Sequence, residues 1–308
     1  MRIHDCFPRT RIVALFVFLL SFSLVLAIPN VGRAVPETLA DSDLHNVNVA
    51  IYFGDGSLGS SVMALKYMFL WMNATVELID GAQIRNGTLD TYDILAFPGG
   101  SATSYVGDLE AEGLDIVREF VRDGGSYFGI CGGAMFATNA ALGLFNGSYS
   151  SPISGIDTYL TEMFVNRNST GPDLSSEPDS YQTMYWGSAY FYSDDMSGVI
   201  PIANYSLNNR PGMIALTYGQ GTVFLSSPHP EYEEGDNRDG TNYCDYLSDP
   251  DSEWPLLLRV SCWLVNASSN ENTDSGIAFP EYITLLVLGS AGLLGLGLVI
   301  YLTRFRKS

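Results

Sequence analysis

The sequence predicts an α/β domain built on a doubly wound, parallel sheet, and three observations carry this prediction. Short β-rich runs alternate with segments of helical periodicity through the first half of the body. The connections between these segments are short and rich in glycine. Their order (strand, helix, strand, strand, helix, strand, helix) is the one that parallel strands with crossover helices produce.

Each element of the first half has a local signal. The expected strands are β-branched or aromatic runs at 47–53, 74–79, 94–97 and 126–130. The expected helices have apolar residues three or four positions apart, or begin at paired glycines, at 57–73, 114–121 and 132–142. Because right-handed crossovers gather the turns after parallel strands at one edge, we expect residues 97–101 and 129–133 to meet.

The second half of the body is less regular. Residues 145–195 are rich in Ser, Gly, Pro, Asn and aromatic side chains, and we interpret them as an irregular insertion or cap with short strands, including one at 181–192. Its aromatic residues could line a pocket, although packing across a short sheet is their commoner role. Strands are expected again at 199–205, 213–218 and 222–226, followed by a helix at 253–266.

The N-terminal end predicts export. Arginines precede the apolar run at 12–27, and small residues and a proline follow it. This order is typical of a secretory signal peptide within residues 1–34, cleaved after Ala27 or Ala34. An uncleaved signal anchor is the alternative, because the apolar stretch runs on to Val31 and is long enough to span a bilayer.

The C-terminal end predicts a single membrane span. Residues 282–302 form a run of 21 residues without a charge, long enough to cross the hydrocarbon layer. The basic tail at 303–308 is then expected in the cytoplasm and the body outside it. Residues 268–281 are interpreted as a polar linker between this span and the domain at 46–267. A processed C-terminal sorting signal is the alternative to a retained anchor.

Charge argues against a nucleic-acid partner. Residues 28–281 hold 9 basic and 33 acidic residues, a net charge of −24 with the histidines neutral. Such a surface repels nucleic acid and anionic lipid headgroups, and a solubilising or salt-adapted role explains it better than cation binding. Six glycosylation sequons fit a surface glycoprotein, at Asn73, Asn86, Asn146, Asn168, Asn204 and Asn266.

The three cysteines of the body allow two interpretations of their redox state. Outside the cell thiols tend to pair, so Cys244 and Cys262 are expected to form a disulfide that leaves Cys131 reduced. Three reduced thiols are the alternative. The sequence has no CxxC or histidine-rich spacing that would bind zinc, so neither a metal nor another cofactor is expected.

Cys131 is the expected nucleophile, in the run SYFGICGGAMFA. A nucleophile on so tight a strand-to-helix turn needs neighbours without Cβ, and glycine supplies them. At a helix N-terminus the thiol faces exposed N–H groups, which favour the thiolate. The N–H of Gly132 can stabilise an oxyanion, and the turn at Gly99 and Gly100 can supply a second donor. A buried structural cysteine is the alternative.

His229 is the expected general base. His45, the other histidine of the body, precedes the first strand and is therefore at the wrong end of the sheet. His229 directly follows the strand at 222–226, so it can reach the edge that carries Cys131. Glu231, two residues further on, can orient the imidazole. A surface histidine beside an acidic run is the alternative.

Three segments together point to a family. FPGG, DIVREFVRDGGSYFGICGGAMFATN and SPHPE resemble the class I glutamine amidotransferase-like superfamily, and within it the amidotransferase-like domain at the N-terminus of some biotin-protein ligases. The likeness covers roughly residues 47–266 and is weakest over 145–195. It implies a flavodoxin-like doubly wound sheet and a site made of nucleophile Cys131, base His229, orienting partner Glu231 and oxyanion-hole glycines Gly99 or Gly100 with Gly132.

One residue departs from the family pattern. Glutamine-hydrolysing members usually carry Gln four residues after the cysteine, where this chain has Met135. No ammonia-accepting or biotin-transferring domain follows, so neither glutamine hydrolysis nor biotin ligation is expected. The sequence predicts a membrane-anchored, extracytoplasmic cysteine hydrolase that cleaves an amide, peptide or ester bond in a small molecule or peptide. The alternative is a catalytically inactive ligand-binding domain of the same fold.

Overall fold

The computed structural model describes residues 43–233, 235, 237–249 and 251–274, with side chains as far as residue 268. Its central sheet has nine strands in the order β2-β1-β3-β4-β11-β10-β9-β6-β7. Five are parallel: β1 Asn48–Tyr52, β2 Thr75–Ile79, β3 Ile94–Phe97, β4 Ser126–Ile130 and β11 Gly221–Ser226. Four continue the sheet antiparallel: β6 Thr158–Val165, β7 Ser180–Trp186, β9 Ile200–Tyr205 and β10 Pro211–Tyr218.

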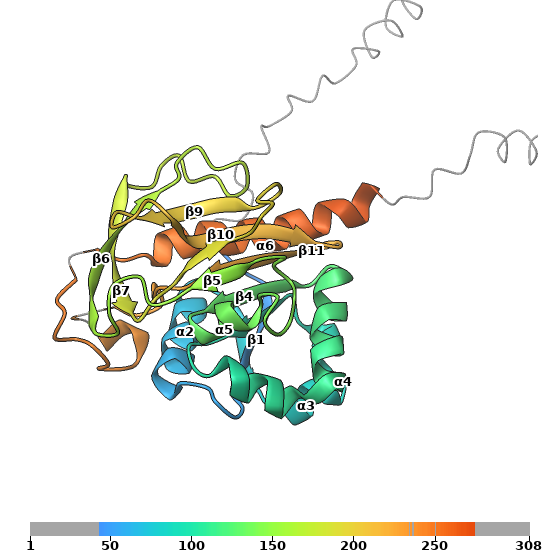
Figure 1. Cartoon of the computed structure of the whole chain (residues 1–308). Coiled ribbons are helices and arrows are strands. Elements are labelled where there is room, and N and C mark those ends of the chain that lie inside the picture. Colours follow the sequence, from blue (N-terminus) through green and yellow to red (C-terminus); the bar gives the residue numbers. More distant parts are fainter. Residues whose placement is uncertain (1–42, 234, 236, 250, 275–308) are drawn as a thin grey trace, which may run out of the picture. The chain divides into compact units, whose positions relative to one another are not determined.

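Helices cover both faces of the sheet, as the doubly wound prediction requires (Figure 1). The buried residues of α2 (Gly59–Trp71) and α6 (Trp254–Asp274) belong to one core. Those of α3 (Gly81–Arg85), α4 (Ala102–Arg122) and α5 (Gly132–Phe136) belong to a second core on the opposite face. The parallel strands follow the order 2-1-3-4-5 of flavodoxin-like sheets, so the α/β prediction is confirmed for this half.

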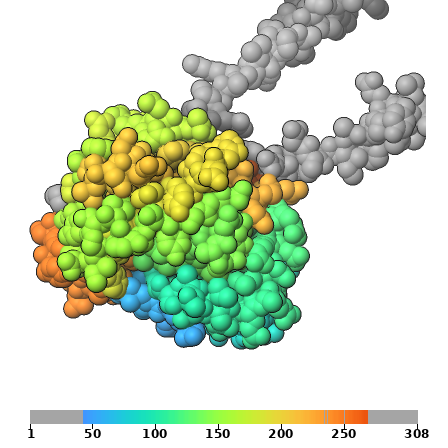
Figure 2. All heavy atoms as spheres, in the orientation of Figure 1, coloured from blue at the N-terminus to red at the C-terminus, as the bar shows by residue number. Residues whose placement is uncertain are grey.

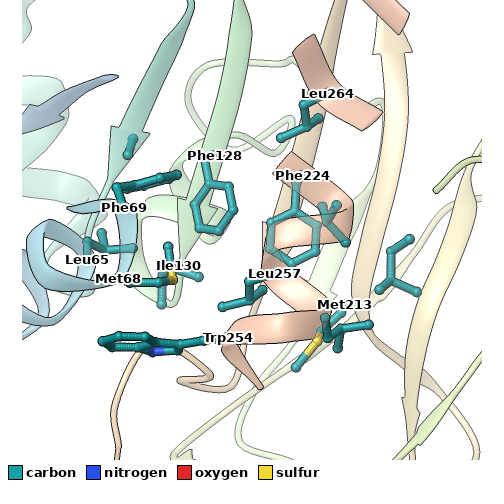
Figure 3. Close-up of a cluster of buried hydrophobic side chains, with 14 of the residues drawn as sticks. Leu65, Met68, Phe69, Phe128, Ile130, Met213, Phe224, Trp254, Leu257 and Leu264 are labelled. Carbon is teal, nitrogen blue, oxygen red and sulfur yellow. The ribbon is translucent and has the colours of Figure 1, made fainter. Parts of the chain in front are cut away.

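The first core is centred on two phenylalanines. Phe128 of β4 and Phe224 of β11 lie side by side, with ring centroids 4.9 Å apart. Side chains of α2 approach Phe128 from one side and side chains of α6 approach Phe224 from the other (Figure 3). Both rings are fully buried, so the core packs α2 and α6 against β4 and β11, the strands that lead into the candidate site.

The predicted parallel, doubly wound sheet is confirmed for five strands, and four antiparallel strands extend it in the second half. Strand β10 returns to β11 through Gly219 and Gln220, and a connection of two residues can only join antiparallel strands. Residues 145–195 are also more regular than expected. They supply β6 and β7 to the central sheet, and β5 (Ser148–Ser150) pairs with β8 (Tyr190–Tyr192) in a small second sheet. In the space-filling view, residues of this region cover a large part of one face (Figure 2).

Three helices differ in length from the prediction. Helix α4 begins at Ala102, twelve residues before the expected start, and contains a kink at Glu110, whose φ is 56°. Helix α5 ends at Phe136 instead of continuing to residue 142. Helix α6 runs through Asp274, so the first part of the predicted linker at 268–281 is helical. Residues 268–274 contain neither glycine nor proline, the residues that commonly end a helix.

The predicted signal at 1–34 and the predicted span at 282–302 lie outside the described residues. Within the described part of the chain, none of the helices combines the length and the apolar character that crossing a membrane requires.

The central core yields a first testable prediction. Phe224→Ala removes a fully buried ring and is expected to lower the free energy of unfolding by about 3–5 kcal/mol, because the neighbours relax only partly into the cavity. Phe164 of β6 is 45% exposed, so Phe164→Ala is a matched control with an expected effect of about 0.5 kcal/mol or less. Urea denaturation measures both. Equal losses would contradict the assignment of Phe224 to the core.

Candidate active site

Two glycine-rich turns meet at the carboxyl edge of the parallel strands, as the sequence predicts. The N–H of Gly133, after β4, donates to the carbonyl of Pro98, after β3, at 3.1 Å. A Cβ on Gly132 would lie 2.1 Å from the carbonyl oxygen of Gly100. The two backbones therefore touch at a point where no side chain fits.

Cys131 sits at the apex of the second turn. Its φ of 48° and ψ of −110° place it in a region that residues other than glycine rarely adopt, between the end of β4 and the first residue of α5. Its N–H donates to the carbonyl of Ser226 at the end of β11, at 2.7 Å. The side chain is half-buried. This is the backbone geometry of a nucleophile elbow, which pushes the side chain out of the sheet edge.

His229 reaches this edge from β11 and is held by the antiparallel half of the sheet. Its N–H donates to the carbonyl of Met184 on β7, at 2.9 Å. Its imidazole is fully buried between the rings of Trp186 and Tyr232, with centroid distances of 5.9 and 5.6 Å. The ring also lies against Gly99, where a Cβ would be 2.8 Å from Cε1.

Glu231 fixes the orientation of the imidazole. Its Oε1 lies 2.9 Å from Nδ1 of His229, and both side chains are fully buried. The same Oε1 accepts a hydrogen bond of 2.7 Å from Oγ of Ser61, and the backbone carbonyl of Glu231 accepts one of 3.0 Å from Nε1 of Trp254. A carboxylate at Nδ1 favours the tautomer with its proton there, which leaves Nε2 as the basic nitrogen.

The pKa of His229 reflects this setting. Burial acts most strongly and lowers it, but the charges of Glu231 and Cys131 and hydrogen bonding to both raise the pKa well above its usual value. Among the described residues no atom meets full hydrogen-bond geometry with Nε2. Cys131 therefore lies close enough to influence the imidazole, and the raised pKa means that His229 binds a proton more tightly than an ordinary histidine does.

The glycine amides differ in their partners. The N–H of Gly99 donates to Oγ of Ser61 at 2.8 Å, so Gly99 does not offer the oxyanion donor that the sequence suggested for it. The N–H groups of Gly100 and Gly132 have no acceptor in the described parts of the chain. Gly100 has a φ of +152°, and a Cβ there would lie 2.1 Å from the carbonyl oxygen of Gly56. The N–H groups of Gly100 and Gly132 are therefore the two that could donate to an oxyanion.

Sequence reasoning missed three residues of the site. Ser61 lies on the buried face of α2, and nothing in its sequence context distinguishes it from Ser60. Trp186 lies at the end of β7, inside the strand expected at 181–192; the sequence suggests that aromatic residues there could line a pocket, but it does not single out Trp186. Tyr232 directly follows Glu231, and this adjacency is the one signal that could have identified it. In the described parts of the chain, no group of three or more His, Cys, Asp or Glu side chains could hold a metal ion.

The predicted Cys244–Cys262 disulfide does not form in the structure. Cys244 is buried in a small cluster with Met184 and Tyr232. Cys262 is half-buried on α6 beside the first core, and its Sγ lies 3.8 Å from the carbonyl oxygen of Asp43. The two cysteines belong to different clusters of buried residues. Of the six sequon asparagines, Asn204 is half-buried and the other five are exposed.

The α/β fold with its large, mostly parallel central sheet matches amidotransferase-like neighbours among the solved structures. A solved structure titled as that of PurLQS from Thermotoga maritima matches it with a TM-score of 0.50 and 16% identity, covering 70% of this chain and 98% of the other. Residues 47–146 match the family described as the N-terminal domain of biotin-protein ligase. The resemblance inferred from the sequence is confirmed. The matched residues contain Cys131 and the glycine turns, whereas His229 and Glu231 lie beyond them.

Two curated proteins are similar to the chain. A biotin–protein ligase of Schizosaccharomyces pombe is 25% identical over 234 residues, which are 66% of this chain and 37% of the ligase. An uncharacterized protein of Chlamydia muridarum is 29% identical over 168 residues, which are 46% of this chain and 62% of that protein. The chain thus matches less than two thirds of the length of either relative.

Gly99 yields a second prediction. In Gly99→Ala the new Cβ meets Cε1 of His229 at 2.8 Å, so the imidazole is expected to shift and the alkylation rate of Cys131 to fall about tenfold. A Cβ on Gly107 of α4 meets nothing within 4 Å, so Gly107→Ala is the control and is expected to leave the rate unchanged. Iodoacetamide labelling followed by mass spectrometry measures both. Equal rates in the two variants would contradict the contact between Gly99 and His229.

Asp249, in the acidic segment that follows His229 in the chain, yields a third prediction. Burial, assisted by the nearby Asp251 and Glu233, raises the pKa of Asp249 to about 7. Between about pH 4 and pH 7 the unfolded chain therefore loses this proton first, and the free energy of unfolding falls as pH rises. In Asp249→Asn this contribution is absent, so the Tm is expected to fall less than that of wild type between about pH 5 and pH 7. Parallel Tm curves for the two proteins would contradict it.

Proposed function

We propose that the protein is a cysteine hydrolase that cleaves an amide, peptide or ester bond through an acyl-enzyme. The observation that carries this proposal is the meeting of Cys131, His229 and Glu231 at one edge of the sheet, with the imidazole held by the carboxylate. Two unengaged glycine amides, of Gly100 and Gly132, stand beside the cysteine turn. Nucleophile, base, orienting group and oxyanion donors are the components that acyl transfer needs.

The proposed reaction has two halves. Sγ of Cys131 attacks the carbonyl carbon of the substrate, its proton passes to Nε2 of His229, and the amides of Gly100 and Gly132 stabilise the oxyanion. The carbon–nitrogen or carbon–oxygen bond then breaks, and the leaving group takes the proton from His229. In the second half, water gives a proton to Nε2 and attacks the thioester. The carbon–sulfur bond then breaks, Sγ takes the proton back from Nε2 of His229, and the acid departs.

We also propose that the body is extracytoplasmic and held at the membrane by the segment at 282–302, with the tail at 303–308 in the cytoplasm. Support comes from the apolar ends, the basic tail and the exposed position of five of the six sequon asparagines. Ammonia released outside the cell would serve no synthetase, and Met135 takes the place of the usual glutamine. We therefore propose a small molecule or peptide other than glutamine as substrate.

Selective alkylation tests the enzyme proposal. At about pH 6.5 iodoacetamide is expected to modify Cys131 at least about tenfold faster than Cys262, because a free thiol is almost wholly protonated there. Cys262 is a matched internal control, since its side chain is also half-buried. His229→Gln is expected to remove most of the difference, because it removes the base.

Turnover supplies the second arm of this test. Wild-type protein is expected to release nitrophenol from p-nitrophenyl acetate with an acylation burst, and Cys131→Ala is expected to abolish the burst. Equal labelling of Cys131 and Cys262 together with no burst would contradict the hydrolase. That outcome would favour the alternative, a catalytically silent domain that binds a ligand at the same edge.

A further inference from the structure

Ser61 joins the two halves of the candidate site. It lies on α2 with no exposed surface, and its hydroxyl makes two hydrogen bonds in opposite senses. It accepts the N–H of Gly99 at 2.8 Å and donates to Oε1 of Glu231 at 2.7 Å. One side chain therefore connects the glycine turn after β3 with the carboxylate that orients the base.

The donor and the acceptor of each hydrogen bond in this series are fixed. A backbone N–H can only donate, so Oγ of Ser61 accepts from Gly99 and its proton points to Glu231. Oε1 of Glu231 then accepts two hydrogen bonds, one from the hydroxyl of Ser61 and one from the Nδ1–H group of His229. Its Oε2 is buried and has no partner among the described residues. The carboxylate is thus oriented by donors to one oxygen.

We propose that Ser61 is a positioning residue that locks Glu231 against His229 and removes Gly99 from the oxyanion donors. This inference rests on the proposed function. Among the described residues, Glu231 without this hydroxyl keeps the imidazole as the single partner of its side-chain oxygens, and the amide of Gly99 loses its acceptor. Both groups are then expected to move, because a buried polar group without a hydrogen-bond partner is unfavourable.

The neighbouring serine provides a matched control. Oγ of Ser60 lies 2.7 Å from the phenolic oxygen of Tyr232, so it binds the same loop as Ser61 does. It makes no hydrogen bond to Glu231 or Gly99 in the described structure. Ser60→Ala therefore removes a contact of α2 with this loop and leaves the connection between the carboxylate and the glycine turn intact.

The test is an NMR titration of the imidazole of His229 in the full-length chain. The whole sequence has three histidines, so the signals are few, and His229→Gln assigns the one of interest. In Ser61→Ala the titration midpoint is expected to fall by about half a pH unit or more, because a displaced Glu231 supports the imidazolium less. In Ser60→Ala it is expected to stay at the wild-type value.

Each outcome decides the proposal. An unchanged or raised midpoint in Ser61→Ala would overturn it, because the hydroxyl would then act only by screening the carboxylate. An equal fall in Ser60→Ala would also overturn it and show a general loosening of the loop. Should Ser61→Ala not fold, Ser61→Cys keeps nearly the same volume with a weaker donor and is expected to shift the midpoint downward by less.

This titration is independent of catalysis. Where the wild-type protein shows neither selective alkylation of Cys131 nor an acylation burst, the hydrolase proposal fails, yet the midpoint in Ser61→Ala still decides the role of the serine. Where the enzyme is active, the two variants are also compared by their alkylation rates at about pH 6.5. Ser61→Ala is expected to slow the labelling of Cys131 about fivefold, and Ser60→Ala less than about twofold.

Discussion

The contact between the α-carbon of Gly132 and the carbonyl of Gly100 is the constraint on which the site depends. It brings the turns after β3 and β4 together so closely that no Cβ fits between them. Cys131 directly precedes Gly132 in this turn and has a positive φ of 48°. Since β11 pairs with the other side of β4, the segment that follows it delivers His229 to the same edge. Three strand ends, rather than any single motif, therefore assemble the site.

Burial strengthens the electrostatic interaction between His229 and Glu231, and it also makes the loss of either partner unfavourable. Neither side chain has exposed surface, so their interaction is weakly screened, and separating them would leave a charge without a partner. The surroundings offset part of that cost. Ser61 donates to the carboxylate, Trp254 donates to the backbone carbonyl of Glu231, and two aromatic rings pack on the imidazole. The pair is consequently held by α2, α6 and β7 as well as by its own loop.

The sequence predicted the parts of the molecule whose signals are local. The five parallel strands, the two glycine turns and the Cys-His-Glu set each depend on a short run of residues that can be recognised alone. Ser61 could not be predicted, because its role depends on where α2 packs and not on its neighbours in the chain. Strand β6 was obscured because it lies among turn-forming residues, whereas the strand expected at 181–192 corresponds to β7 and β8. The early start of α4 was hidden by Gly107 and Gly113, which normally oppose a helix.

The antiparallel half of the sheet is part of the site and not an appendage to it. The family match ends at residue 146, before β6 and β7 begin, and yet Met184 of β7 holds the backbone of His229 while Trp186 packs on its ring. Cys131 and the glycine turns thus come from the matched segment, whereas His229 is held by residues outside it. A change at Met184 or Trp186 would therefore act on the backbone or the ring of His229. The setting of the imidazole depends on a strand that the family match does not cover.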